Sequence, residues 1–439
     1  IGASVARICA ANGADVKKVN LINVRGIHIC KSMLAYREFG KGSTPEKEGI
    51  KSDHFVGDYY VKYDKWLKTN PEVEEQAREL LRAWENDDPT VRALWTLMNK
   101  WAIDGINRTY EKTGISFDKF YFESQTYKRG REEVLKGLAQ GVFYREEDGS
   151  VWVDLAEVNL DKKVLLRKDG TSLYLTQAIG TAIARHEDWP FERLIYVVAS
   201  EQQYHFKVLF YVLEKLGFEW ARNLFHLSYG MVNLPEGKMK SREGTVVDAD
   251  DLIEELTEMA RKEITEKGRE GEVDDVEGTA FAVALGALNY FLLQAAPTKD
   301  IIFNPRESIS FNGNTGPYLQ YMGARISSML RKYEERKEGY QKGAFNGELL
   351  STQEERELVK SLLSFPEVVR DAADGLDPSM ITGYLFELSK VYSRFYHDSP
   401  ILHAEDPNLV VTRVALSTAV LHVLRNAFAL IGIPFLEKM

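Results

Sequence analysis

The fold class is decided in residues 176–216, which read TQAIGTAIARHEDWPFERLIYVVASEQQYHFKVLFYVLEKL. The centre of this stretch, Leu194–Ala199, is a short apolar run rich in β-branched residues, a pattern typical of a strand buried on both faces. The segments on either side, Thr176–Arg185 and Gln202–Leu216, carry apolar residues at helical spacing. A buried strand between two helices predicts a parallel sheet with helices packed on its faces.

The same alternation of strands and helices extends through the first half of the chain. An opening helix is predicted to end near Asn12-Gly13, and a polar, helical stretch at Lys51–Gly114 interrupts the strands as an insertion. Further strands are predicted at residues 18–24, 117–123, 142–153 and 225–229. We therefore predict an α/β fold, a Rossmann-type doubly wound parallel sheet with insertions.

The second half of the chain has few strand signals. Amphipathic helices are predicted from about Asp248 to Met439, with breaks at Pro297, Pro305, Pro366 and Pro378, and Arg331–Lys342 is interpreted as a charged helix end and linker. The predicted organisation is a first catalytic part at 1–50, a helical insertion at 51–115, a second catalytic part at 116–272 with a small insertion near 131–170, and an all-α helical bundle at 273–439.

Composition sets only wide bounds on function. The chain is 44% hydrophobic and 28% charged, as in an ordinary globular protein, and we find no apolar run near 18 residues that predicts a membrane span. Its net charge of −10 argues weakly against a nucleic-acid partner, although a local basic face can coexist with an acidic remainder. Cys9 and Cys30 form no spacing motif and are interpreted as small buried hydrophobic residues in a reducing compartment.

The strongest local motif is the basic loop 237–244, GKMKSREG. A loop that ends in glycine and carries several cations suits a mobile clamp on a polyphosphate, where it stabilises charge as pyrophosphate leaves. Taken alone, such a run is more often an exposed basic loop. Its position after a predicted strand and before the acidic helix start at Asp248–Glu255 favours the phosphate-binding interpretation, because α/β folds place their ligand loops there.

This loop resembles the signature loop of class I aminoacyl-tRNA synthetases, in the form found in arginyl enzymes, with Lys240 and Ser241 exchanged relative to the usual order. Other segments resemble the same family and follow its order along the chain: Val19–Ser32, Phe117–Tyr127, Ser172–Thr181, Val197–Phe206, Asn314–Arg325 and Leu421–Met439. The resemblance covers essentially all 439 residues, and several ordered matches are far more specific than one loop.

The resemblance implies a catalytic domain followed by a helical anticodon-binding domain. It implies an aminoacyl-tRNA ligase that activates L-arginine with ATP and Mg²⁺ and transfers it to the 3′ end of tRNA(Arg). It also implies a cytoplasmic monomer that binds no membrane and holds no metal ion of its own.

The resemblance further assigns site residues. It implies arginine binding by Glu123, Tyr174 and Gln202; ATP binding by His205, Lys238 and Met239; catalytic roles for Lys238, Lys240, Ser241 and Arg242; and tRNA binding by Tyr318, Gln320, Tyr321 and Arg325.

Elementary chemistry is consistent with these roles but leaves alternatives open. A guanidinium is planar and permanently charged, so its pocket needs a carboxylate such as Glu123 beside an aromatic or hydroxyl wall such as Tyr174. Without the family, Glu123 is as well explained as a surface or capping residue, and Tyr174 as a core residue. Tyr318, Tyr321 and Arg325 share one helix face, suited to stacking unpaired bases or to packing, and the Tyr392, Phe395 and Tyr396 group more strongly favours packing.

Three features depart from the family pattern. None of the eight histidines forms the pair, separated by two residues, of the first class I signature, which by the family's layout would end just before Ile1. Adenylate formation is expected to fail if the chain as written is complete. Val24 and Ala178 stand where the family generally has aspartates, and the second of these pairs with the substrate guanidinium.

Two alternative functions follow from these departures. The first is a catalytically impaired, synthetase-like tRNA-binding protein, favoured by Val24, Ala178 and the missing signature and opposed by the retained basic loop and Glu123. The second is a class I synthetase for another amino acid, for which the loss of the guanidinium-facing aspartate is the one supporting feature.

Overall fold

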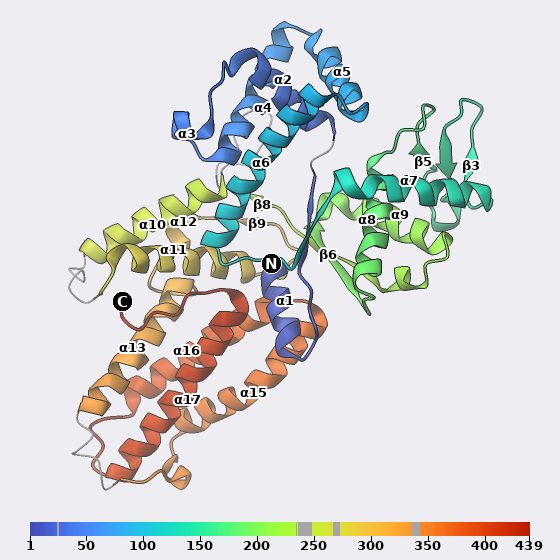
Figure 1. The fold of residues 1–439 in the computed structure, drawn as a ribbon. Helices are drawn as coiled ribbons and strands as arrows, with labels where there is room; N and C mark the ends of the chain where they lie inside the picture. The colour runs from blue at the N-terminus through green and yellow to red at the C-terminus, as the bar shows by residue number, and fades with distance from the viewer. Residues whose placement is uncertain (24–25, 234, 236–247, 267–272, 336–342) are drawn as a thin grey trace. The chain divides into compact units, whose positions relative to one another are not determined.

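The computed structural model describes residues 1–23, 26–233, 235, 248–266, 273–335 and 343–439 (Figure 1). These residues form two compact units. One unit contains the described residues from Lys17 to Ser228, and the other combines Ile1–Val16 with the described residues from Tyr229 onward.

The α/β part of the first unit is built from short strands followed by helices. Its elements are β1 (Val19–Ile22), β2 (Lys119–Phe122), α7 (Glu123–Ala139), α8 (Tyr174–Asp188), β6 (Leu194–Ala199), α9 (Gln203–Lys215) and β7 (Leu224–Tyr229). β1 pairs with β2 in parallel register, Val19 opposite Lys119, and β6 pairs with β7. Apolar side chains from α7, α8, α9 and the neighbouring strands pack into one buried cluster that includes Val134, Ile179, Val212 and Leu213. This cluster fixes the helices that carry the candidate site.

Helices α7 and α8 cross at unusually close range because each has a glycine at the contact. A Cβ on Gly130 would lie 1.8 Å from the backbone oxygen of Thr176, and a Cβ on Gly180 would lie 2.3 Å from that of Thr126. The hydroxyls of Thr126 and Thr181 meet at 2.8 Å in the same interface. Any side chain at either glycine would therefore force the two backbones apart.

Two insertions extend this unit. The smaller is an antiparallel three-stranded sheet formed by β3 (Tyr144–Arg145), β4 (Val151–Val153) and β5 (Lys163–Leu166). The larger is a helical cluster of α2 (Ile27–Phe39), α3 (Pro45–Glu48), α4 (Ser52–Thr69), α5 (Val73–Glu85) and α6 (Pro89–Lys112). Its core contains Met33, Tyr63, Trp84 and Met98, each with at most 2% of its surface exposed. Helix α2 packs in this core together with the helices that follow it.

The second unit is mainly helical. It contains α1 (Gly2–Ala11), β8 (Val232–Asn233), α10 (Ala249–Glu266), α11 (Val276–Leu293), β9 (Ile301–Ile302), α12 (Pro305–Ser308), α13 (Gly316–Glu335), α15 (Gln353–Gly375), α16 (Ser379–Asp398) and α17 (Pro407–Ile431). The orange-to-red helices α13, α15, α16 and α17 lie against one another in Figure 1 and share one large apolar cluster. β8 and β9 form a short parallel pair.

The opening helix α1 packs on this helical cluster rather than on a strand. Ile8 is part of the cluster, and the Asn12 amide donates to the backbone oxygen of Val369 at 3.0 Å. Helices α11 and α17 are long and apolar enough to cross a membrane by length and composition, contrary to the sequence expectation of no such run. Both contribute most of their apolar residues to the buried clusters, as core helices do.

Several expectations about individual elements were confirmed and others were wrong. The predicted helices at 176–185 and 202–216 correspond to α8 and α9, and the predicted strand at 194–199 is β6. The predicted break at Pro366 is wrong, because this proline lies inside α15, whose flanking residues contact the apolar cluster on both sides. Tertiary packing there outweighs the hydrogen bond that proline removes.

Candidate functional site

The predicted arginine-binding residues Glu123 and Tyr174 are the first residues of α7 and α8. Glu123 directly follows strand β2 and is 97% buried, whereas Tyr174 is half exposed. A third helix, α9, begins just after strand β6, and Gln202 is its N-cap residue. The first turns of these helices leave backbone N–H groups without intrahelical partners, so they favour bound anionic groups.

Tyr174 is the residue at which the parts of the site meet. Its ring lies 4.8 Å from the ring of His205 in the first turn of α9. Partial burial raises the pKa of Tyr174, the nearby carboxylate of Glu123 raises it further, and a side-chain hydrogen bond with Asn23 opposes the rise. Glu123, Tyr174, His205 and Asn23 therefore lie together at the ends of β1 and β2 and the starts of α7, α8 and α9.

His205 is held in its neutral form. Burial, together with the neighbouring ring of His226, lowers the pKa of His205 from 6.5 to about 4. Its ring also contacts Phe206, which in turn contacts Tyr196 and His226. A neutral imidazole next to Tyr174 can accept or donate a hydrogen bond to a substrate at pH 7 without adding charge to the site.

The low pKa of His205 predicts a pH-dependent stability. The unfolded chain binds a proton at this residue near pH 6.5 and the folded chain only near pH 4, so the unfolded state holds more protons in between. Stability is expected to be fully present above pH 6.5 and to fall as the pH drops through this window. The measurement is urea unfolding of the parent and a His205→Gln variant from pH 7 to pH 4. Parallel pH profiles for the two proteins would contradict the prediction.

Ala178 lies one helical turn after Tyr174 on α8. Its methyl group packs at the edge of the apolar cluster that α7, α8 and α9 share, and it is partly exposed. The position therefore supplies no charge beside Tyr174, whereas Glu123 does. Of these two positions, 123 and 178, only Glu123 carries a carboxylate.

The remaining predicted residues of the catalytic part differ in whether the structure describes them. Gln202 is exposed at the N-cap of α9, three residues before His205. Five predicted loop residues and the departure at Val24 lie outside the residues that the structure describes; the loop residues are Lys238, Met239, Lys240, Ser241 and Arg242.

The predicted tRNA-binding residues lie on α13 in the helical unit. The guanidinium of Arg325 is 4.0 Å from the centre of the Tyr396 ring, and the Tyr318 ring lies 6.3 Å from that of Phe386, both partners being on α16. Tyr318, Tyr321, Arg325 and Tyr396 are all partly exposed. The two helices thus present aromatic rings beside a cation, which suits stacking of unpaired bases.

Gln320 requires a correction, because it does not share this surface. Its side chain is fully buried, and its amide donates to the backbone oxygens of Ala282 and Pro434, at 2.9 Å each. It therefore joins α13 to α11 and to the C-terminal segment and is not available to RNA. Tyr392 and Phe395 are also fully buried, which confirms the packing interpretation for these two aromatic residues.

Asn23 is the member of the site that sequence reasoning did not select. It follows β1 immediately, and its hydrogen bond with Tyr174 joins residues 151 positions apart. The signal available in the sequence was its position: a polar residue at the carboxyl end of a predicted parallel strand is where α/β folds bind ligands.

Comparisons with known proteins show the family of the chain. Residues 1–305 match the family described as "tRNA synthetases class I (R), catalytic domain", and residues 319–439 match the "DALR anticodon binding domain". The chain is 62% identical to the arginine–tRNA ligase of Treponema denticola and 50% identical to that of Bacteroides thetaiotaomicron, in each case over its whole length and over 75% and 76% of the relative. The arginyl-tRNA synthetase of Thermus thermophilus has a similar structure, with a TM-score of 0.83 and 27% identity over all of this chain and 78% of that one.

The fold and these matches define a class I aminoacyl-tRNA synthetase, with a Rossmann-like catalytic domain followed by a helical anticodon-binding domain. Within this class, the chain belongs to the arginyl-tRNA synthetase family, whose members use ATP to join arginine to tRNA.

Proposed function

We propose that this chain activates L-arginine with ATP, bound as its magnesium complex, and transfers the arginyl group to the 3′ end of tRNA(Arg). The observation that carries the proposal is the grouping of the buried Glu123 carboxylate with Tyr174 and His205 at three helix starts. This grouping offers a carboxylate to a guanidinium and helix N-termini to the anionic parts of the substrates.

The proposed reaction needs no covalent bond to the protein. The arginine carboxylate attacks the α-phosphate of ATP, a new P–O bond forms, and the bond to pyrophosphate breaks. Glu123, Tyr174 and Gln202 hold arginine, and His205 contacts the adenylate while remaining neutral. From the sequence, Lys238, Lys240, Ser241 and Arg242 stabilise the leaving pyrophosphate and Met239 contacts the nucleotide.

Mg²⁺ is assigned to the nucleotide rather than to a protein site. It binds polyphosphate oxygens and retains several waters, so it neutralises the charge of ATP without requiring a cage of carboxylates. In the second step the terminal hydroxyl of tRNA attacks the arginyl adenylate and AMP leaves. The surface of Tyr318, Tyr321, Arg325 and Tyr396 is proposed to bind unpaired bases of the same tRNA.

We further propose a cytoplasmic monomer with the predicted arrangement of catalytic parts, insertions and helical domain. The experiment that tests the function is charging of tRNA by the full product of the gene, with arginine compared against the other amino acids. Charging with arginine that is lost in a Lys238→Ala variant supports the enzyme. Intact tRNA binding without charging by any amino acid would instead identify a synthetase-derived tRNA-binding protein.

Ala178 is the observation that favours this alternative, and it allows a gain-of-function prediction. Ala178→Asp is expected to lower the dissociation constant for arginine about 10- to 100-fold, because a hydrogen bond to a charged group is worth roughly 1.5–3 kcal/mol. Calorimetric titration of arginine would measure the change. Ala178→Asn is the matched control, since it has the same size without the charge and should bind like the parent. Equal affinities for all three proteins would show that position 178 does not face the guanidinium.

A further inference from the structure

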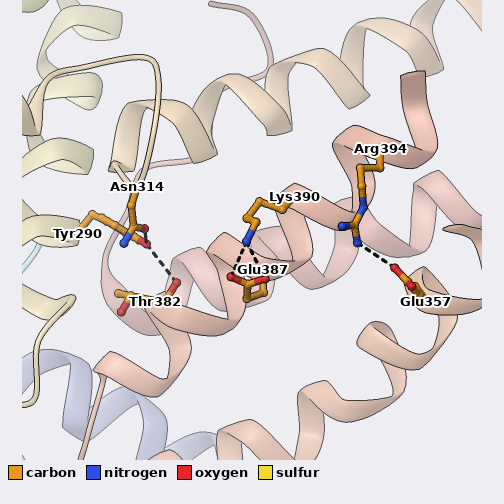
Figure 2. Close-up of polar contacts among 7 residues, drawn as sticks. All are labelled: Tyr290, Asn314, Glu357, Thr382, Glu387, Lys390 and Arg394. Carbon is orange, nitrogen blue, oxygen red and sulfur yellow. Dashed lines mark hydrogen bonds and ion pairs between the residues drawn. The ribbon is translucent and has the colours of Figure 1, made fainter. Parts of the chain in front are cut away.

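The outward face of α16 carries a row of side chains that the proposed site does not use. Phe386, Lys390 and Arg394 are spaced four residues apart, so they occupy successive turns of one helix face, and we call these three residues the α16 row. Figure 2 shows Lys390 beside Glu387, one turn before it on the same helix, and Arg394 beside Glu357 of α15.

The α16 row continues directly from the proposed base-stacking surface. The Phe386 ring lies 6.3 Å from that of Tyr318, and the Lys390 ammonium lies 5.3 Å from the centre of the Phe386 ring. The order along this path is therefore a stacking tyrosine, a second aromatic ring, a lysine and, one turn further, an arginine. An RNA strand with a base stacked on Tyr318 would place its following phosphates near Lys390 and Arg394.

The start of α16 is firmly anchored, so the row has a fixed position. The Tyr290 hydroxyl of α11 donates to Asn314, in the segment before α13, and to the backbone oxygen of Thr382 at 3.2 Å, as drawn in Figure 2. The Thr382 hydroxyl in turn donates to the backbone oxygen of Leu293 at 3.3 Å. These bonds join α11, α16 and the start of α13 into one frame that carries both the stacking surface and the α16 row.

Lys390 and Arg394, the two cations of the α16 row, form ion pairs weak enough to be exchanged for other partners. Lys390 contacts Glu387 at 3.0 Å and Arg394 contacts Glu357 at 2.8 Å, and each of these four side chains is more than a third exposed. Exposed ion pairs of this kind contribute about 0–1 kcal/mol. A phosphate within reach competes well with such a carboxylate, because its contacts release counterions from the RNA and are charge-assisted hydrogen bonds.

We propose that Lys390 and Arg394 bind the phosphate backbone of the tRNA strand whose bases stack on the Tyr318 surface, and that Glu387 and Glu357 compete with that backbone. This inference rests on the proposed function, since it assumes a tRNA on the helical domain. The carboxylates hold the cations in place in the free protein and weaken binding of RNA that does not also engage the stacking surface. This arrangement of paired cations suits a chain whose net charge is −10, because its affinity for RNA must come from a few cations at fixed positions.

The test measures binding of a tRNA(Arg) transcript to the full chain by fluorescence anisotropy, over a series of salt concentrations. Lys390→Ala and Arg394→Ala are each expected to weaken binding about three- to tenfold at low salt. Each should also make the logarithmic salt dependence shallower by about 0.7–1, as loss of one phosphate contact does. Glu387→Gln should strengthen binding a few-fold, because it removes the competing charge and keeps the shape.

A matched control pair lies on α15. Arg370 contacts Glu367 at 3.1 Å with the same three-residue spacing and similar exposure, so Arg370→Ala and Glu367→Gln should leave tRNA binding unchanged. A Lys390→Ala protein with an unchanged salt dependence, or a Glu387→Gln protein that binds more weakly, would overturn the inference while leaving the proposed function intact. A parent chain that binds no tRNA at all would overturn both.

Discussion

Replacing Glu123 by glutamine is expected to raise the dissociation constant for arginine at least about a hundredfold. The side chain is 97% buried at the start of α7, and its negative charge acts directly on Tyr174. Removing one member of a buried ion pair costs about 3–5 kcal/mol, because the other charge remains without its partner. Since every 1.4 kcal/mol is a factor of ten in affinity, the lower end of that range corresponds to roughly a hundredfold.

Calorimetric titration of arginine against the parent and variant chains measures this effect. Glu132→Gln is the matched control, because Glu132 lies on the same helix with its side chain exposed. The control should bind arginine like the parent. A Glu123→Gln protein with unchanged affinity would show that the guanidinium is recognised elsewhere, and the proposed roles of Glu123 and Tyr174 would both have to be abandoned.

Replacing Gly130 by alanine is expected to destabilise the first unit strongly, although alanine is the better helix former. In an open helix this change would stabilise by roughly 1 kcal/mol. Here the new Cβ would lie 1.8 Å from the backbone oxygen of Thr176, an atom that cannot rotate away. Overpacking of this kind typically costs 1–3 kcal/mol and occasionally more, so the net sign should be unfavourable.

Gly57 provides the control, because it also lies within a helix, α4, but a Cβ there meets no atom within 4 Å. Gly57→Ala should therefore raise the midpoint of urea unfolding slightly, whereas Gly130→Ala should lower it. The second variant should also bind arginine more weakly, because the α7–α8 contact sets the separation of Glu123 and Tyr174. A Gly130→Ala chain as stable as the parent would show that the helices can separate at little cost.

These two variants examine different requirements of the same site. Glu123 supplies the charge, and Gly130 with Gly180 permits the close helix crossing that brings this charge to Tyr174. Ala178→Asp examines a third requirement, the second carboxylate that the family resemblance implies. Together the three outcomes distinguish an arginine-activating enzyme from a protein that has kept the fold and lost the pocket.

Much of the fold could be predicted because its signals are local. The apolar run Leu194–Ala199 and the helical spacing on either side of it predicted β6, α8 and α9 with nearly correct bounds. The short strands β8 and β9 were missed, since two-residue strands have no periodicity to detect. Pro366 was misassigned because packing of α15 on both sides of the proline outweighs its local preference.

The candidate site, like the fold, could be predicted in part from the sequence. The residue types and their order along the chain determined the family, the arginine-binding candidates Glu123 and Tyr174, and the basic loop at 237–244. Chemistry of this kind is encoded locally, because a carboxylate, a tyrosine or a run of cations keeps its character wherever the chain places it.

Only the tertiary structure decided which candidates lie together. It placed Asn23 and His205 against Tyr174, buried Gln320 between backbone oxygens, and put Arg325 over the ring of Tyr396. Tyr318, Gln320 and Tyr321 are neighbours on one helix, yet their exposure depends on what α11, α16 and the C-terminal segment cover. The physical reason is that burial and contact depend on segments far apart in the sequence, and a residue's own neighbours in the chain do not specify them.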